Sequence, residues 1–160
     1  DHPKVSFDHH MGLLGALSMS KTIADTYYYG SIQKFGQVKV FFAHATDKVI
    51  YLWSVRYEDK GRLYELWLER RPNLQTQFEK RRVDFLNVIS FYWAMKGLLE
   101  EATDKIIGLQ QEHHSKLVQH LFSTPPTERL DAVVNPSTLK LTEENDKARM
   151  HLSSPFFTSK

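Results

Sequence analysis

The chain has 160 residues, of which 41% are hydrophobic and 25% charged, and its formal net charge is +2 at pH 7. This composition is typical of one folded domain, or a small domain with tails, and it excludes wholesale disorder. The small net charge argues against nucleic acid or an anionic membrane as the main partner. The absence of cysteine excludes disulfides, thiol catalysis and thiolate metal sites.

The N-terminal part of the chain predicts an arm and a helix. The chain begins at Asp1 rather than at methionine. This start has two explanations: the sequence was cut from a longer one, or a targeting peptide was removed. The second explanation favours an organellar, mitochondrial location over the cytoplasm. Residues 1–10 indicate an irregular arm. The leucines, alanines and methionine that follow predict a helix from about 13 to 29, although Gly12 and Gly15 weaken its propensity.

Three runs with strand character come next, at residues 38–43, 49–57 and 63–68. In the second run apolar and polar side chains alternate with a period of two, and valine and aromatic residues are frequent, as is typical of a half-buried strand. The connections are short, so neighbouring strands are expected to be antiparallel. The runs therefore predict a three-stranded antiparallel meander that needs cover on one face, because three strands alone are barely stable.

A long helix is predicted between Pro72 and the pair Pro125–Pro126, over about residues 74–122. Its N-terminus is expected at Asn73 or at a capping box over 76–79. A helix of this length measures roughly 70 Å at 1.5 Å per residue, which exceeds the width of a compact domain of this size. Residues 85–99 are apolar almost all round the helix, which indicates burial on several sides. We therefore expect the first half to pack on the sheet and the second half to project.

A stripe of apolar residues with alternating steps of four and three runs along this helix, as in a coiled coil. The stripe consists of Val88, Tyr92, Met95, Leu99, Ala102, Ile106 and Leu109. We expect it to bind a partner protein. On this interpretation Leu99→Glu weakens folding as well as association, whereas Ile106→Glu affects mainly association. Complete burial of Ala102, Ile106 and Leu109 by the chain itself, with no other molecule in contact, would contradict the scaffold interpretation and leave a self-contained globule.

Residues 123–160 hold four of the six prolines and predict an extended tail. Short helices are expected at about 128–134 and 142–150, and the tail is expected to drape over the domain or a neighbour. The predicted fold class is α+β, with an N-terminal helix, a three-stranded meander, one long helix and this tail. The domain is expected to span 1–122, and the tail 123–160.

Candidate chemistry is sparse. Eight histidines are present, but no HExxH motif and no helical ligand pair at the usual spacing, so we expect no metal. No GxSxG motif and no glycine-rich phosphate-binding loop occur, so we expect neither a cofactor nor nucleophilic catalysis. The carboxylates Glu100, Glu101 and Asp104 are expected on a solvated helix face rather than in a catalytic pair.

Two basic clusters flank the apolar part of the long helix. They contain Arg70, Arg71, Arg81 and Arg82, with Lys80 next to the second pair. We expect these arginines to form a secondary polar contact with a protein partner, and a membrane surface is a further candidate. Arginines beside sheet aromatics also occur in RNA-binding modules, but no RNP-like string is present here, so nucleic acid is an unlikely partner.

These features predict a non-catalytic structural or assembly subunit that binds other subunits of a larger complex through the long helix and its termini. A small ligand-binding or enzymatic domain is the first alternative, and an RNA-associated accessory module is the second. The first alternative requires an aromatic pocket between sheet and helix. Its lining would be Trp53, Tyr57, Trp67, Tyr92 and Trp93.

Overall fold

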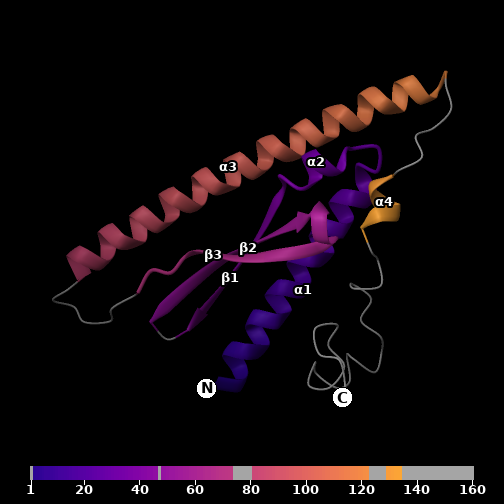
Figure 1. The fold of residues 1–160 in the computed structure, drawn as a ribbon. Coiled ribbons are helices and arrows are strands. Elements are labelled where there is room, and N and C mark those ends of the chain that lie inside the picture. The colour runs from indigo at the N-terminus through magenta and orange to yellow at the C-terminus, as the bar shows by residue number, and fades with distance from the viewer. Residues whose placement is uncertain (1, 47, 74–80, 123–128, 135–160) are drawn as a thin grey trace, which may run out of the picture.

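The computed structural model describes residues 2–46, 48–73, 81–122 and 129–134. It confirms the predicted α+β class, with helices around one three-stranded antiparallel sheet (Figure 1). In chain order the elements are α1 (His2–Thr26), α2 (Ile32–Phe35), β1 (Lys39–Thr46), β2 (Val49–Glu58), a 3-10 turn (Asp59–Gly61), β3 (Leu63–Arg70), α3 (Arg81–His120) and α4 (Leu130–Val133).

Helix α1 covers one face of the sheet, and this packing makes it longer than predicted. Leu17 of α1 packs with Val40 and Val55, which are directly paired across β1 and β2. At Gly12 a methyl group would overlap the ring of Phe42, so glycine permits the close approach of helix and strand. The irregular arm predicted for residues 1–10 is wrong from His2 onward, because tertiary packing outweighs weak local helix propensity.

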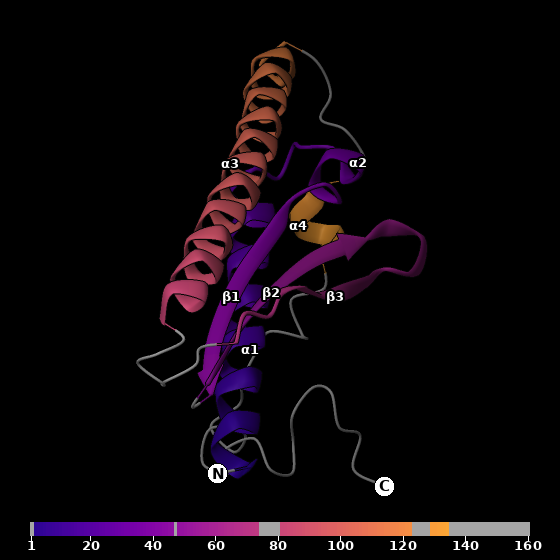
Figure 2. The ribbon, with the colours of Figure 1, turned by 90° about the vertical axis from the view of Figure 1, so that its left-hand side faces the viewer.

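The sheet has the order β1-β2-β3, as the meander predicted. The turn between β2 and β3 ends at Arg62, which has a left-handed backbone with φ of 49°. Trp53 pairs with Leu68 and Leu52 with Arg70, so Glu69 is an extra residue that forms a β-bulge. Figure 2 shows β3 at the edge of the sheet away from α3.

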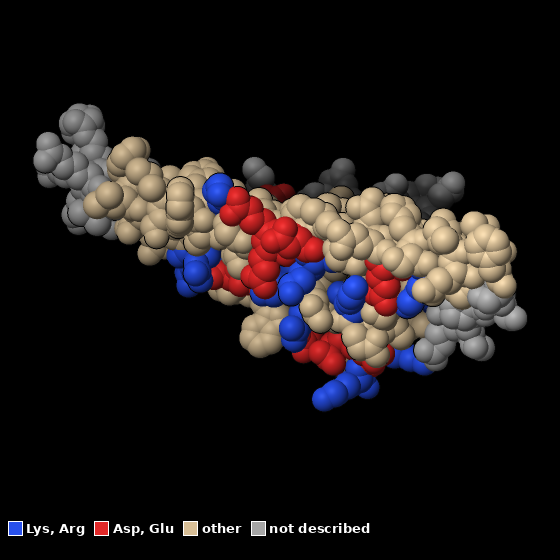
Figure 3. Space-filling model, turned by 90° about the horizontal axis from the view of Figure 1, so that it is seen from above, with Lys and Arg blue, Asp and Glu red and all other residues tan. Residues whose placement is uncertain are grey.

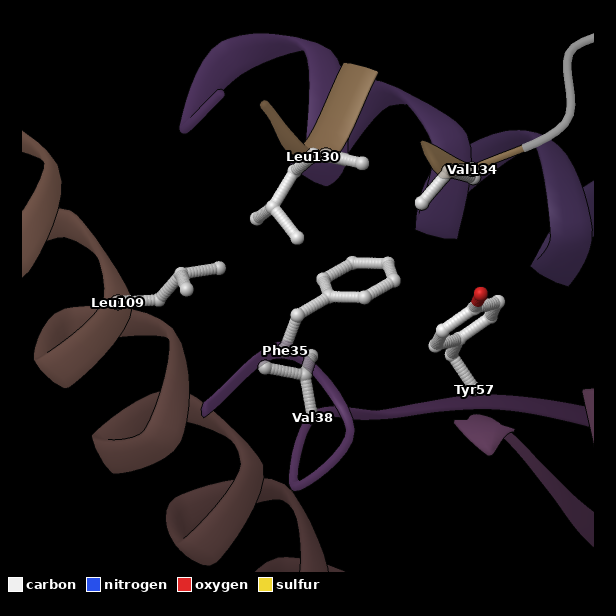
Figure 4. Packing of buried hydrophobic residues seen from close by; sticks show 7 residues of the cluster. Phe35, Val38, Tyr57, Leu109, Leu130 and Val134 are labelled. Atoms are coloured by element: carbon white, nitrogen blue, oxygen red, sulfur yellow. The ribbon is translucent and has the colours of Figure 1, made fainter. Parts of the chain in front are cut away.

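The largest core cluster joins residues that lie far apart in the sequence (Figure 4). Phe35 and Leu109 are 1% and 0% exposed, and they come from α2 and from the second half of α3. Leu130 and Val134, at 1% and 0%, close the cluster from α4. The segment 130–134 therefore contributes to the core, although it was expected in the tail. The predicted capping box at 76–79 and the predicted helix at 142–150 lie outside the described residues.

The half of helix α3 that packs on the rest of the protein is the second half, whereas the first half was predicted. The second half packs on the connection between α1 and α2: Ser31 donates from its backbone N and its Oγ to Glu112 Oε2, at 3.1 and 2.9 Å. Among residues 85–99 only Phe91 is buried. The expectation that the first half packs as core and the second half projects is therefore wrong. The reason is that α1 already covers the apolar face of β1 and β2.

Candidate functional site

The first half of α3 carries an exposed apolar surface, which we call the outer face. Its members are Phe85, Leu86, Ile89, Tyr92, Trp93 and Leu99, with exposed fractions between 45% and 74%. Trp93 is the most exposed of them at 74%. The spacings of three and four residues place these side chains along one side of the helix, away from buried Phe91.

The size of the outer face is unusual for a surface that meets only water. A fully exposed aromatic side chain offers about 150–250 Å², so the six side chains together present on the order of 700 Å². The largest apolar patch on a typical monomer is about 300–600 Å², and a stable protein interface covers about 800 Å² per partner. The outer face is therefore close to the area that one partner contributes to an interface.

Charged residues limit the outer face on the side toward the middle of the helix. Lys96 and Glu100 form an exposed ion pair at 2.5 Å one turn after Trp93. Figure 3 shows Lys, Arg, Asp and Glu gathered over the middle of the molecule in this view. Exposed apolar side chains also occur in and just after the second half of α3, at Ile107, Leu117, Val118, Leu121 and Phe122, so the outer face is one of two apolar surfaces that the charged middle separates.

The structure divides the predicted stripe into two parts. Its N-terminal members Tyr92 and Leu99 are exposed at 54% and 45%, and they belong to the outer face. Val88 and Met95 are half-buried. Ala102 and Leu109 are buried by this chain, and Ile106 packs against the main core cluster. Ala102 and Leu109 are therefore not accessible to a partner, which contradicts their predicted role, and Ile106 is only half-buried.

The predicted arginines are placed in two groups. Arg70 and Arg71 lie at the end of β3 and are exposed beside residues 87–91 of α3. Arg81 and Arg82 belong to the first turn of α3, and their side chains lie outside the described part. The secondary polar contact expected of these four arginines stays a prediction.

The aromatic pocket predicted between sheet and helix is not formed, because its residues are divided between surfaces. Tyr57 packs on Phe35 in the core, with ring centroids 5.6 Å apart. Trp67 pairs with Ser54, which lies on the other face of the sheet from Tyr57, and is 57% exposed. Tyr92 and Trp93 belong to the outer face. The enzymatic alternative therefore loses its proposed site.

The open face of the sheet offers little to RNA. Two cations of the face that carries Ser54 are engaged by carboxylates: Lys39 Nζ lies 2.7 Å from Glu69 Oε1, and Arg56 Nη2 lies 2.8 Å from Glu65 Oε2. Hydrogen bonds from Arg56 hold the pKa of Glu65 below its usual range. These two ion pairs reduce the positive charge that this part of the sheet can offer to a phosphate backbone.

Two histidine-containing clusters were the remaining candidates for chemistry. His9 lies between β1 and β2, with its ring centroid 5.3 Å from that of His44 and 4.9 Å from that of Trp53. Burial lowers the pKa of His9, and the neighbouring His44 lowers it further. No three histidine or acidic residues of the described ranges are arranged to hold a metal ion.

The second cluster surrounds His113, which is 6% exposed. Its Nδ1 accepts a hydrogen bond of 3.2 Å from the backbone N of Tyr29, and the two rings stack at 5.7 Å. Burial lowers the pKa of His113, with a smaller contribution from His114. His113 therefore joins α3 to the α1–α2 connection, which is a structural role.

Within the part of the chain that the structure describes, no helix combines the length and the apolar character needed to cross a membrane. Comparison of the chain with models of protein families, with curated proteins and with solved structures gives no match. The sequence did carry a signal for the outer face, namely the apolar run at 85–99. Periodicity alone could not distinguish a buried helix from one with an exposed apolar side.

Proposed function

We propose that the protein is a non-catalytic structural subunit of a protein assembly and that the outer face docks against an apolar helix of another subunit. The observation that carries this proposal is the exposure of six large apolar side chains over about four turns of one helix. Trp, Tyr and Phe are enriched in the cores of protein interfaces, and three of the six residues are of these types. Their helical spacing suits the ridges and grooves of a second helix.

The test compares two double variants of the full chain, each produced in the cells from which the protein comes. Leu86→Glu with Trp93→Glu places two charges on the outer face, at side chains that are 66% and 74% exposed. Gln111→Glu with Ser115→Glu adds the same charge at exposed positions farther along α3. The mass of the purified particle is measured by size-exclusion chromatography with light scattering, and urea unfolding checks the fold.

We expect the wild-type chain and the control variant in a particle much larger than the 18.7 kDa monomer. The outer-face variant should be recovered as a monomer with unchanged stability, because buried charges at an interface lack partners. A wild-type chain that is recovered as a monomer would overturn the proposal. So would an outer-face variant that keeps the wild-type particle mass.

A further inference from the structure

A cavity of about 350 Å³ lies between the end of β3 and the first half of α3, beside the outer face. It is lined by Arg70, Arg71, Pro72, Asn73, Asn87, Ser90 and Phe91. We call it the arginine cleft. Its volume is at the lower end of the range found for small-molecule sites, about 300–1,000 Å³.

The lining of the arginine cleft is rich in hydrogen-bond donors and contains two positive charges. No carboxylate of the described residues forms an ion pair with Arg70 or Arg71. The neighbouring Glu69 attracts Arg70, but its Oε1 accepts from Lys39 Nζ and Ser54 Oγ, both at 2.7 Å. Burial raises the pKa of Glu69, but these hydrogen bonds, with a smaller contribution from the attraction of Arg70, outweigh it and hold the pKa below its usual value.

The wall that carries the arginines is held in place by the sheet. The backbone N of Ile50 donates to Pro72 O at 3.1 Å, and Asn73 forms an antiparallel bridge with Val49. The Arg71 guanidinium lies 5.3 Å from the centre of the Tyr51 ring, at cation–π distance. A fixed backbone and a stacked guanidinium reduce the entropy that a ligand must overcome on binding.

A second cavity shows why the arginine cleft is distinctive. That cavity, of about 180 Å³, also has two cations in its lining, Lys116 and Arg129. Each of them is already paired: Lys116 Nζ lies 2.9 Å from Glu112 Oε1, and Arg129 Nη2 lies 2.6 Å from Asp131 Oδ2. The second cavity is thus neutralised internally. In the arginine cleft, Arg70 Nη1 donates to the backbone O of Glu69 at 2.9 Å, but neither arginine forms an ion pair with a described carboxylate.

We propose that the arginine cleft binds the phosphate group of a phosphate ester. Two guanidinium groups balance the charge of a phosphate monoester and match the geometry of its oxygens. The amides of Asn73 and Asn87 and the hydroxyl of Ser90 supply further donors around the same space. Buried Phe91 offers an apolar contact for the organic part of the ester. This site is separate from the docking role of the outer face.

The experiment titrates the full chain with glycerol 3-phosphate, with glycerol as the uncharged control, by isothermal titration calorimetry at low salt. A second arm measures sedimentation with phosphatidylcholine vesicles that contain phosphatidic acid, the headgroup of which is a phosphate monoester, against vesicles of phosphatidylcholine alone. Saturable binding in solution identifies a soluble phosphate ester, and binding only to the anionic vesicles identifies a lipid headgroup. Both outcomes support a phosphate site, provided that they depend on the arginines.

That dependence is measured with Arg70→Gln/Arg71→Gln and with the matched control Lys116→Gln/Arg129→Gln. We expect the Kd to rise at least tenfold in the first variant and to stay unchanged in the control. Asn87→Asp is a further variant that keeps both arginines and the exposed helix surface but places a carboxylate in the cleft, so it should also abolish binding. Absence of binding to both probes, or equal binding by the first variant and the control, would overturn the proposal.

Discussion

Gly30 and Leu109 are in direct contact where the α1–α2 connection meets α3. A methyl group added at Gly30 would overlap Leu109 Cδ1 and would lie 3.0 Å from Tyr27 O. Leu109 is 0% exposed and has no free space into which it could move. The absence of a side chain at residue 30 therefore allows the second half of α3 to pack on the core.

We expect Gly30→Ala to lower the free energy of unfolding by about 1–3 kcal/mol, the range for an overpacked core. Gly97→Ala is the matched control, because nothing lies within 4 Å of the added methyl group there. In the middle of α3 that change should raise the stability by about 0.5–1 kcal/mol, since alanine favours the helix. Urea unfolding measures the free energy of unfolding of both variants. Equal effects of the two changes would show that residue 30 does not need to be glycine for α3 to pack on the core.

Ile106→Glu should unfold the protein or lower its stability by more than 2 kcal/mol, roughly the cost of placing an unpaired charge against the core. Leu99→Glu should change it by only about 0.5 kcal/mol, because Leu99 is 45% exposed. This order is the reverse of the one that the sequence predicted. Thermal unfolding followed by circular dichroism measures both variants, and a fold equally tolerant of the two charges would show that Ile106 is not a core residue.

The stability should fall as the pH is lowered from 7.5 to 5.5. Burial holds the pKa of His113, His9 and His44 below the ordinary value of about 6.5, so the unfolded chain binds protons first. The contribution of each histidine is complete above pH 6.5 and is lost as the pH falls toward its folded pKa.

His113→Asn keeps an acceptor for the Tyr29 backbone N–H but does not titrate. We therefore expect it to reduce the slope of unfolding free energy against pH in this window. Measurements stay above pH 5, because the lowered pKa values of Glu69 and Glu112 add a separate loss of stability in more acidic solution. An unchanged slope in the variant would mean that protonation of His113 does not oppose folding.

Leu130→Ala should cost about 2–5 kcal/mol, the range for removal of a fully buried leucine side chain. Ala132, which is exposed in the same short helix, provides the control: Ala132→Ser should have an effect within about 0.5 kcal/mol. Urea unfolding compares the two. A Leu130 variant as stable as the control would show that the fold is complete without α4.

The elements that could be predicted from the amino-acid sequence are those whose signal is local. The period-two alternation around Trp53 predicted the antiparallel sheet, and the prolines at 72 and 125 bounded the long helix. Helix α2 was not predicted. It has only four residues and begins where Ser31 Oγ accepts from the backbone N of Lys34, and a segment this short has no apolar period.

Only the tertiary structure decided which side of α3 is buried. An apolar run such as 85–99 has no direction of its own, because hydrophobic burial depends on area and not on orientation. Contacts between residues far apart in the sequence set the orientation of α3. The absence of a side chain at Gly30 leaves space for Leu109, and Ser31 donates a hydrogen bond to Glu112, 81 positions away. These contacts turn Trp93 outward, and they put the arginines at the end of β3 beside Ser90 of α3.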